Sequence, residues 1–203
     1  MIILDCKQNT PEWDIARIGI ATSSSFNKIV TTKGVLSTSR KKYLYMKAGE
    51  RISGEKRETY KNGFMDKGHE REDESRKLYE FVNDTKVEQV GFCFFDENKE
   101  FGCSPDGLVG EDGGFENKNA EADIQLERLE EGWSGMEHFQ QVQGSLYVTG
   151  RKWWDLVSYS RGLPQVVVRF ERNEEFIKKL AVEIRIFNND IIKLDEKYSI
   201  KEK

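Results

Sequence analysis

The residues best suited to chemistry lie between positions 104 and 118 of the chain. Asp106 belongs to a Ser-Pro-Asp-Gly sequence typical of a turn, and Glu116 and Lys118 belong to a segment with the pattern of a strand. Residues two apart in a strand point to the same face, so Glu116 and Lys118 are expected side by side. A hairpin between the two segments would return Asp106 to the neighbourhood of Glu116.

Two carboxylates that meet in this way favour a divalent cation between them. The cation offsets their repulsion, and hard oxygen ligands suit Mg²⁺ or Mn²⁺. A lysine beside them can orient an attacking water or stabilise charge that develops on a phosphate. The alternative is a hairpin that carries exposed surface charges, because the acid-x-Lys spacing recurs in the chain. It occurs at Asp5–Lys7, Asp84–Lys86, Glu97–Lys99 and Asp195–Lys197.

Helical and extended patterns alternate around this segment. Helices are expected over 11–30, 38–52, 62–82, 120–131, 136–148 and 173–197, with an interruption near 22–25 in the first of them. Strands are expected over 90–95, 101–103, 107–109, 115–118, 153–159 and 166–170. This order of elements predicts an α/β layered core.

Length and composition exclude several classes of protein. The 203 residues contain no linker or repeat, which predicts a single domain over 1–203. No apolar run is long enough for a membrane span, and no signal peptide is recognisable, so a cytoplasmic protein is expected. The three cysteines form no C-x-x-C pair, which argues against a disulfide scaffold, a four-cysteine zinc site or an iron–sulfur cluster.

Positive charge is concentrated in one part of an acidic chain. The net charge is −4, yet residues 40–61 contain eight basic and three acidic residues, with tyrosines between them. Two interpretations stay open for this segment: a solvated helix face, or a surface that contacts phosphates.

Five motifs in order carry a resemblance to a known family. They are Trp13-x-x-x-Arg17-x-Gly19-x-x-Thr22-x-Ser24, Gly68-x-x-x-Glu72, Ser104-Pro105-Asp106-Gly107-Leu108, Glu116-x-Lys118, and Gln141-Val142-Gln143 followed by Tyr147. The third and fourth resemble the signature of the PD-(D/E)XK nuclease superfamily. Together, over roughly 12–160, the five are similar to the phage lambda exonuclease-like group, the YqaJ-type viral recombinases. The resemblance implies a restriction-endonuclease-like core, in which helices flank a central mixed sheet and further helices are added at both termini.

The resemblance also implies a role for each site residue. Asp106 and Glu116 would be the principal ligands of two Mg²⁺ ions, for which Mn²⁺ can substitute, and the main-chain carbonyl of Asn117 would be a further ligand. Glu72 would lie beside the metals, and Lys118 would orient the nucleophilic water.

Three further residues take roles from the same motifs. Gln141 and Gln143 cannot share a helix face, so Gln143 alone is assigned to the second metal position. Arg17 and Ser24 would hold a 5′-terminal phosphate, since a guanidinium and a hydroxyl near a helix start make a good anion site.

The activity implied is a Mg²⁺-dependent 5′-to-3′ exonuclease on linear double-stranded DNA that leaves 3′ single-stranded tails. A toroidal homotrimer and a single-strand annealing partner in phage-type recombination are also implied, with no membrane association. One alternative is another nuclease of the superfamily, RecB-like or Cas4-like, although the missing cluster cysteines argue against the latter.

A second alternative is a catalytically weak DNA-binding or scaffold protein that recruits an annealing partner. It stays open because Asn117 and Asn119 replace the apolar residue and the cysteine common in the family. A buried Asn side chain needs hydrogen-bond partners.

Overall fold

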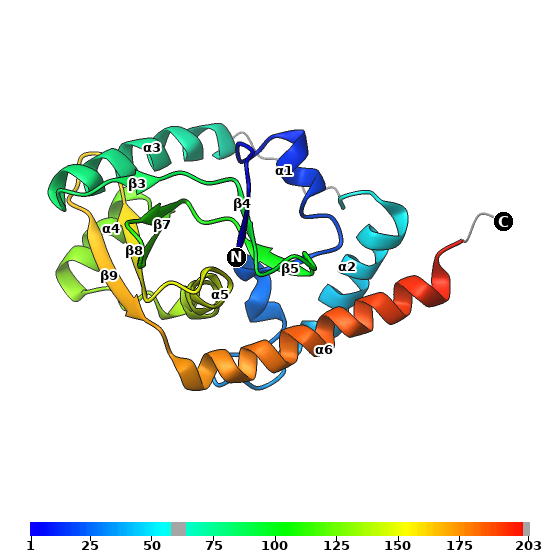
Figure 1. Ribbon diagram of the computed structural model, residues 1–203. Coiled ribbons are helices and arrows are strands. Elements are labelled where there is room, and N and C mark those ends of the chain that lie inside the picture. Colours follow the sequence, from blue (N-terminus) through cyan, green and yellow to red (C-terminus); the bar gives the residue numbers. More distant parts are fainter. Residues whose placement is uncertain (58–63, 201–203) are drawn as a thin grey trace.

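The computed structural model describes residues 1–57 and 64–200 of the chain, with the backbone alone for residues 64–69. The last residues of the basic segment 40–61 and the first residues of the expected helix 62–82 therefore lie outside the described residues. Two sheets are present (Figure 1). The smaller sheet has the order β1 (Ile2–Leu4), β4 (Phe92–Phe94), β5 (Phe101–Cys103) and β2 (Ala21–Thr22). The larger has the order β3 (Val87–Glu88), β6 (Gly107–Val109), β7 (Gly113–Asn119), β8 (Trp153–Tyr159) and β9 (Val166–Glu171).

The larger sheet is mixed because it combines two hairpins with one crossover. Strands β6 and β7 pair antiparallel across a short turn, and β8 and β9 do the same. Strands β7 and β8 are parallel, so a long connection must return the chain to the end of the sheet at which β7 began. That connection contains α4 (Ala122–Glu131), the short 3₁₀ helix η2 (Met136–His138) and α5 (Phe139–Thr149).

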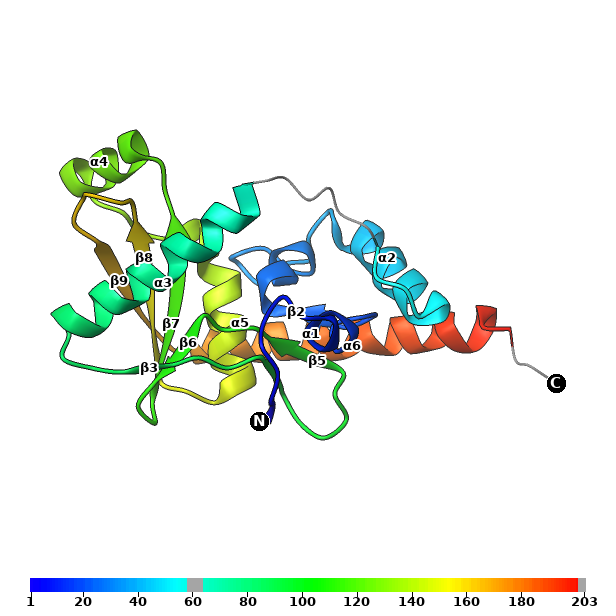
Figure 2. The same cartoon turned by 90° about the horizontal axis from the view of Figure 1, so that it is seen from above.

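Helix α5 is central, since it contacts strands of both sheets. Its residues Val142 and Leu146 are fully buried, as is Trp154 of the neighbouring strand β8. Helix α3 (Phe64–Val82) packs on β7, where the ring of Tyr79 contacts that of Phe115 with centroids 4.9 Å apart. Seen from above, α3 crosses the strands of the larger sheet and α5 lies beside them (Figure 2).

Helix α6 (Glu174–Tyr198) is the long helix predicted at the C-terminal end, and it packs along α2 (Arg40–Ser53). The Asn173 side chain caps it by accepting the N–H of Phe176 at 2.9 Å. Its buried residues recur at helical spacing, and Phe187 stacks on Tyr43 of α2. Among the described residues, no helix has both the length and the apolar composition needed to span a membrane.

The helical stretch expected over 11–30 is divided near 22–25, as expected, but its first helix is shorter than expected. Helix α1 covers only Pro11–Ile15, and the chain then turns into β2 and the 3₁₀ helix η1 (Ser23–Lys28). The reason is Gly19, which has φ +68° and lies so close to α2 that an added Cβ would stand 2.6 Å from the Cβ of Arg51. Only glycine accommodates this conformation and this contact, and the helix cannot continue through it.

A buried carboxylate ties the sheet to α3. Asp155 of β8 is 1% exposed and accepts hydrogen bonds from Arg169 at 2.7 Å and from the Tyr79 hydroxyl at 2.6 Å. Burial, together with the charge of Asp155, raises the pKa of Tyr79, so the hydroxyl stays a donor.

Removing Arg169 and removing Asp155 should lower the free energy of unfolding by different amounts. We expect Arg169→Ala to lower the free energy of unfolding by about 3–5 kcal/mol, because it leaves a buried carboxylate without its cation. Asp155→Ala should cost about 2 kcal/mol, because it leaves Arg169 half-exposed and able to rehydrate. Urea unfolding measures both, with Arg161→Ala as an exposed ion-pair control expected within about 1 kcal/mol of wild type. Equal costs for Arg169→Ala and Asp155→Ala would contradict this account.

Candidate active site

The β6–β7 hairpin places Asp106 next to Glu116, as the sequence predicts. Gly107 pairs with Phe115 in the antiparallel ladder, so Asp106, the residue before β6, lies opposite Glu116. The main-chain N–H of Asn117 donates to Asp106 Oδ2 at 2.7 Å and fixes that carboxylate against the strand. Burial, followed by the charges of Glu116 and Glu72, raises the pKa of Asp106 well above its usual value. Three carboxylates therefore act on one another at this point of the fold.

Lys118 lies on the same face of β7 as Glu116. Its Nζ is 3.0 Å from Glu116 Oε1 and 3.1 Å from Gln141 Oε1. Burial works against the charged amine, but Glu116 and Asp106 outweigh it and raise the pKa of Lys118. The lysine is therefore a fixed cation beside the carboxylates.

The glutamine that joins the site is Gln141, and the prediction that Gln143 faces it is wrong. Gln141 Nε2 donates to Glu116 Oε1 at 2.6 Å. Gln143 is 1% exposed, and its amide bonds the main chain of Glu171 at 2.8 Å and of Asn173 at 2.8 Å. Gln143 is four residues from Phe139 and three from Leu146, and all three lie on the buried face of α5.

Glu72 of α3 lines a cleft that Asp106 also lines. This cleft has a volume of about 840 Å³ and is lined by Glu72 and Asp106, together with Gln8 and its neighbours near the N-terminus. The electrostatic effect of Glu72 on Asp106 shows that the two carboxylates are close. The structure thus brings together Glu72, Asp106, Glu116 and Lys118.

Asn117 points away from the site and is satisfied by partners on the other side of the sheet. Its Oδ1 accepts from the hydroxyl of Ser75 at 2.5 Å, and its Nδ2 donates to Asn119 at 2.9 Å. Gln165 donates to the same Ser75 hydroxyl at 2.8 Å. Ser75 stands three residues after Glu72, so this polar cluster also holds α3 on β7 behind the carboxylates.

This cluster makes a prediction about stability. Ser75→Ala removes the only hydroxyl that bonds Asn117 Oδ1 in the described structure, and we expect it to lower the free energy of unfolding by about 1–3 kcal/mol. The double change Ser75→Ala with Asn117→Val should cost less than the sum of the two single changes, because the valine removes the acceptor that Ser75→Ala leaves stranded. Urea denaturation tests this, and additive costs in the double variant would contradict it.

Arg17 and Ser24 both lie around the buried Tyr43 of α2. Arg17 interacts electrostatically with Tyr43, and burial lowers the pKa of Arg17. The hydroxyl of Ser24 is 3.2 Å from that of Thr22, whose N–H donates to the Tyr43 hydroxyl at 3.4 Å. Burial raises the pKa of Tyr43 to about 12.

Further cations surround this pair that the motif does not contain. Lys47 is buried, and its charge is disfavoured by both Arg17 and Lys28. Glu50 is the carboxylate that offsets them, since it accepts from Lys47 Nζ at 2.8 Å and from the N–H of Gly19 at 3.2 Å. A local excess of positive charge of this kind suits an anion.

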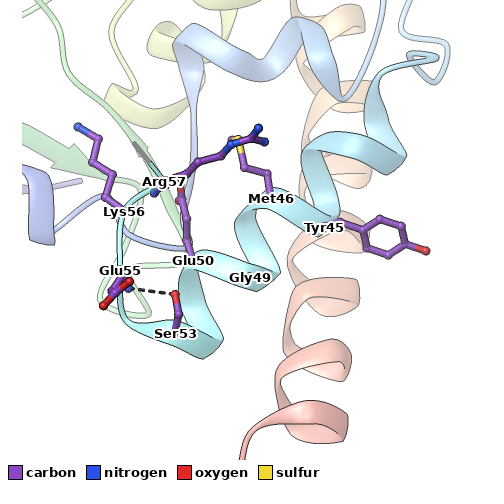
Figure 3. A pocket seen from close by; sticks show the side chains of 8 residues that line it. All are labelled: Tyr45, Met46, Gly49, Glu50, Ser53, Glu55, Lys56 and Arg57. Carbon is purple, nitrogen blue, oxygen red and sulfur yellow. Dashed lines mark hydrogen bonds between the residues drawn. The ribbon is translucent and has the colours of Figure 1, made fainter. Parts of the chain in front are cut away.

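The positive charge extends to the end of α2. A cavity of about 750 Å³ lies there, with Lys56 and Arg57 in its wall close to Glu50 (Figure 3). The N–H of Arg57 donates to Glu50 Oε1 at 3.4 Å. The described part of the basic segment 40–61 includes buried and cavity-lining cations as well as an exposed helix face. Features of both interpretations of this segment are therefore present.

The donor set suits a hard divalent cation. Within the described part of the chain, no three His, Cys, Asp or Glu side chains already stand at metal-ligand spacing. Mg²⁺, however, is commonly held by one or two carboxylates, with water and substrate phosphate completing its shell. Asp106 and Glu116 supply the carboxylates, and burial, followed by the neighbouring charges of Glu116 and Glu72 that a cation would offset, raises the pKa of Asp106. These residues fit Mg²⁺ or Mn²⁺.

Comparison with known proteins supports this account of the fold. The alkaline exonuclease LHK-Exo from Laribacter hongkongensis has 30% sequence identity and a TM-score of 0.81, covering 93% of this chain and 95% of its own. Its structure in complex with dAMP matches with the same values. A phage related exonuclease from Haemophilus somnus 129PT, with 16% identity and a TM-score of 0.68 over 89% and 96% of the two chains, shares the fold. No match is found among curated protein sequences.

The predicted α/β fold of the PD-(D/E)XK type is confirmed by these structures. A family model described as the YqaJ-like viral recombinase domain matches residues 12–152, which span the motifs from Trp13 to Gln143. The chain therefore belongs to the YqaJ-like viral recombinase family.

Proposed function

We propose that the chain is a metal-dependent exonuclease that degrades one strand of linear double-stranded DNA from the 5′ end and leaves 3′ single-stranded tails. The observation that carries this proposal is the convergence of Asp106, Glu116 and Lys118 at the β6–β7 hairpin. Membership of the family and the similarity to an alkaline exonuclease support the reaction class.

Each residue of the site has a role in this reaction. Asp106 and Glu116 would hold Mg²⁺, with Glu72 at the edge of the cleft and the main-chain carbonyl of Asn117 as a further oxygen donor. When bound, the ion supplies a Lewis acid that activates water and stabilises charge on the phosphate. Lys118 directs the nucleophilic water toward phosphorus. Gln141 forms hydrogen bonds with both Lys118 and Glu116 and so holds these two side chains in position. Two ions, for which Mn²⁺ can substitute, would serve the attacking and leaving oxygens.

Assembly and partners are part of the same proposal. A homotrimeric ring would enclose the DNA and reconcile an acidic chain with an anionic substrate, because only the channel need be positive. A single-strand annealing protein would receive the 3′ tail, and the chain would act in the host cytoplasm. The scaffold alternative depended on a poorly packed Asn117, and the bonds of this amide to Ser75 and Asn119 lend it no support.

The decisive experiment compares a linear duplex with 5′-phosphates and a covalently closed circle, each incubated with Mg²⁺ or with EDTA. An exonuclease consumes the linear DNA in Mg²⁺, spares the circle and stops in EDTA. Labels at the 5′ or 3′ terminus give the polarity. Cleavage of the circle would indicate an endonuclease, and binding without cleavage would favour the scaffold.

Arg17 should determine the preference for phosphorylated ends. We expect Arg17→Ala to reduce the ratio of kcat/KM for 5′-phosphoryl over 5′-hydroxyl duplex by roughly tenfold or more, because a charge-assisted contact to the terminal phosphate is lost. Arg40→Ala is the control, since that arginine belongs to the basic segment but pairs with Asp190 of α6. An unchanged ratio in Arg17→Ala would place the phosphate site elsewhere.

A further inference from the structure

Trp13 contacts both the proposed phosphate anchor and the metal-binding turn. Its indole Nε1 donates to Ser104 Oγ at 3.0 Å, and Ser104 precedes Asp106 by two residues. The guanidinium of Arg17 lies over the same indole, 3.7 Å from the ring centroid. A single side chain thus connects two residues, Arg17 and Ser104, that belong to different motifs and are 87 positions apart in the chain.

The connection is rigid. Trp13 is 9% exposed and packs with Phe92 and Phe94 of the smaller sheet. Thr10 accepts the N–H of Trp13 and so fixes its position in the first turn of α1. Such packing leaves the indole little freedom to move between its two contacts.

Arg17 depends on this ring for its orientation. Its Nε is buried and has no hydrogen-bond partner in the described part of the chain. Stacking on an aromatic face holds a guanidinium while leaving its N–H groups directed at an anion. The position of Arg17 therefore follows the position of the indole.

Gln8 offers an informative contrast, because it supports the same turn without touching Arg17. Its amide donates to the carbonyl of Pro105 at 2.7 Å and to that of Val90 at 3.0 Å. The segment before α1 is thus attached to the metal-binding turn at two points. Only the attachment through Trp13 also carries Arg17.

We propose that Trp13 is a positioning residue that sets the separation between Arg17 and the Asp106 turn, and thereby selects which phosphodiester from the 5′ end is hydrolysed. The inference rests on the proposed exonuclease function. A terminal phosphate held at a fixed distance from the hydrolytic centre places one particular linkage there. Small displacements of such a site have large kinetic effects, so loosening the tether should mix the cleavage positions.

The test uses Trp13→Phe, Ser104→Ala, the double variant, and Gln8→Ala as the matched control, all in the full chain. Trp13→Phe keeps an aromatic face and loses the N–H, whereas Ser104→Ala removes the acceptor with little change in volume. Initial products from a 5′-phosphorylated duplex are sized by mass spectrometry, and kcat/KM is compared for 5′-phosphoryl and 5′-hydroxyl ends.

We expect the wild type to release a first product of one length, and both single variants to release a mixture of lengths. Their preference for 5′-phosphate should fall roughly three- to tenfold, the loss typical of one hydrogen bond. The double variant should be no worse than the more affected single variant, because the two changes break the same contact. Gln8→Ala should lower kcat while product length and end preference stay as in wild type.

Other results overturn the inference. If the wild type degrades DNA but Ser104→Ala keeps both the product length and the end preference, the tether has no such role and the proposed function stands. The same conclusion follows if Gln8→Ala shifts product length as much as Ser104→Ala does. A wild-type protein that leaves linear duplex intact in Mg²⁺ overturns the proposed function and this inference together.

Discussion

Replacing Lys118 with alanine should lower the rate of DNA hydrolysis by about 10²- to 10⁴-fold, the usual contribution of a group that directs proton transfer or nucleophilic attack. The fold should survive, since within the described residues the hydrogen bonds of the lysine go to Glu116 and Gln141 at the edge of the site. Metal binding should be kept or strengthened, because Lys118 Nζ forms an ion pair with Glu116 Oε1, an oxygen that would face the ion. Single-turnover cleavage measures the rate, calorimetry with Mn²⁺ the metal affinity, and anisotropy in Ca²⁺ the DNA affinity.

Two variants make this result specific. Lys118→Met keeps the aliphatic stem and should be as slow as Lys118→Ala, so lost packing is separated from lost charge. Lys197→Ala removes an exposed lysine with the same acid-x-Lys spacing on α6, and its rate should equal that of wild type. Near-normal cleavage by Lys118→Ala, or equal losses in Lys118→Ala and Lys197→Ala, would reject the role assigned to Lys118.

The centre of the site could be predicted from the sequence because it is local. Asp106, Glu116 and Lys118 lie within thirteen residues, and a strand period of two with one turn is enough to place them together. The same locality explains why the strands at 101–103, 107–109 and 153–159 agree with the structure in extent.

What the sequence could not provide depends on packing between distant segments. The partner of the buried Asn117 is Ser75, 42 residues away on another helix, and no periodicity connects the two. Gln141 was missed because the phase of α5 depends on which face lies against the larger sheet. The early end of α1 follows from the contact of Gly19 with α2, which is likewise a tertiary constraint that overrides local propensity.

Asp106→Asn should abolish most of the activity without weakening the fold. Asparagine has the same shape and keeps an oxygen for the N–H of Asn117, so the turn should be retained. The lost charge removes a principal metal ligand, and we expect cleavage to fall by about 10³-fold or more, as for other charged groups that stabilise a transition state. Gln8→Ala serves as the comparison, since it alters the same turn without altering its charge.

The stability of Asp106→Asn should change in the opposite direction to its activity. Burial and the charges of Glu116 and Glu72 raise the pKa of Asp106 in the folded protein, so above the ordinary carboxyl pKa this group destabilises the folded state relative to the unfolded chain. Without metal, the variant should therefore unfold at higher urea than wild type at pH 7. The difference should shrink as the pH falls toward the ordinary carboxyl pKa of about 4, where Asp106 is protonated in the folded state. Added Mg²⁺ should stabilise the wild type alone, because only the wild type retains both carboxylates that bind the ion. A variant less stable than wild type at pH 7 in EDTA would contradict this account. It would mean that the Asp106 charge stabilises the metal-free folded chain instead of destabilising it.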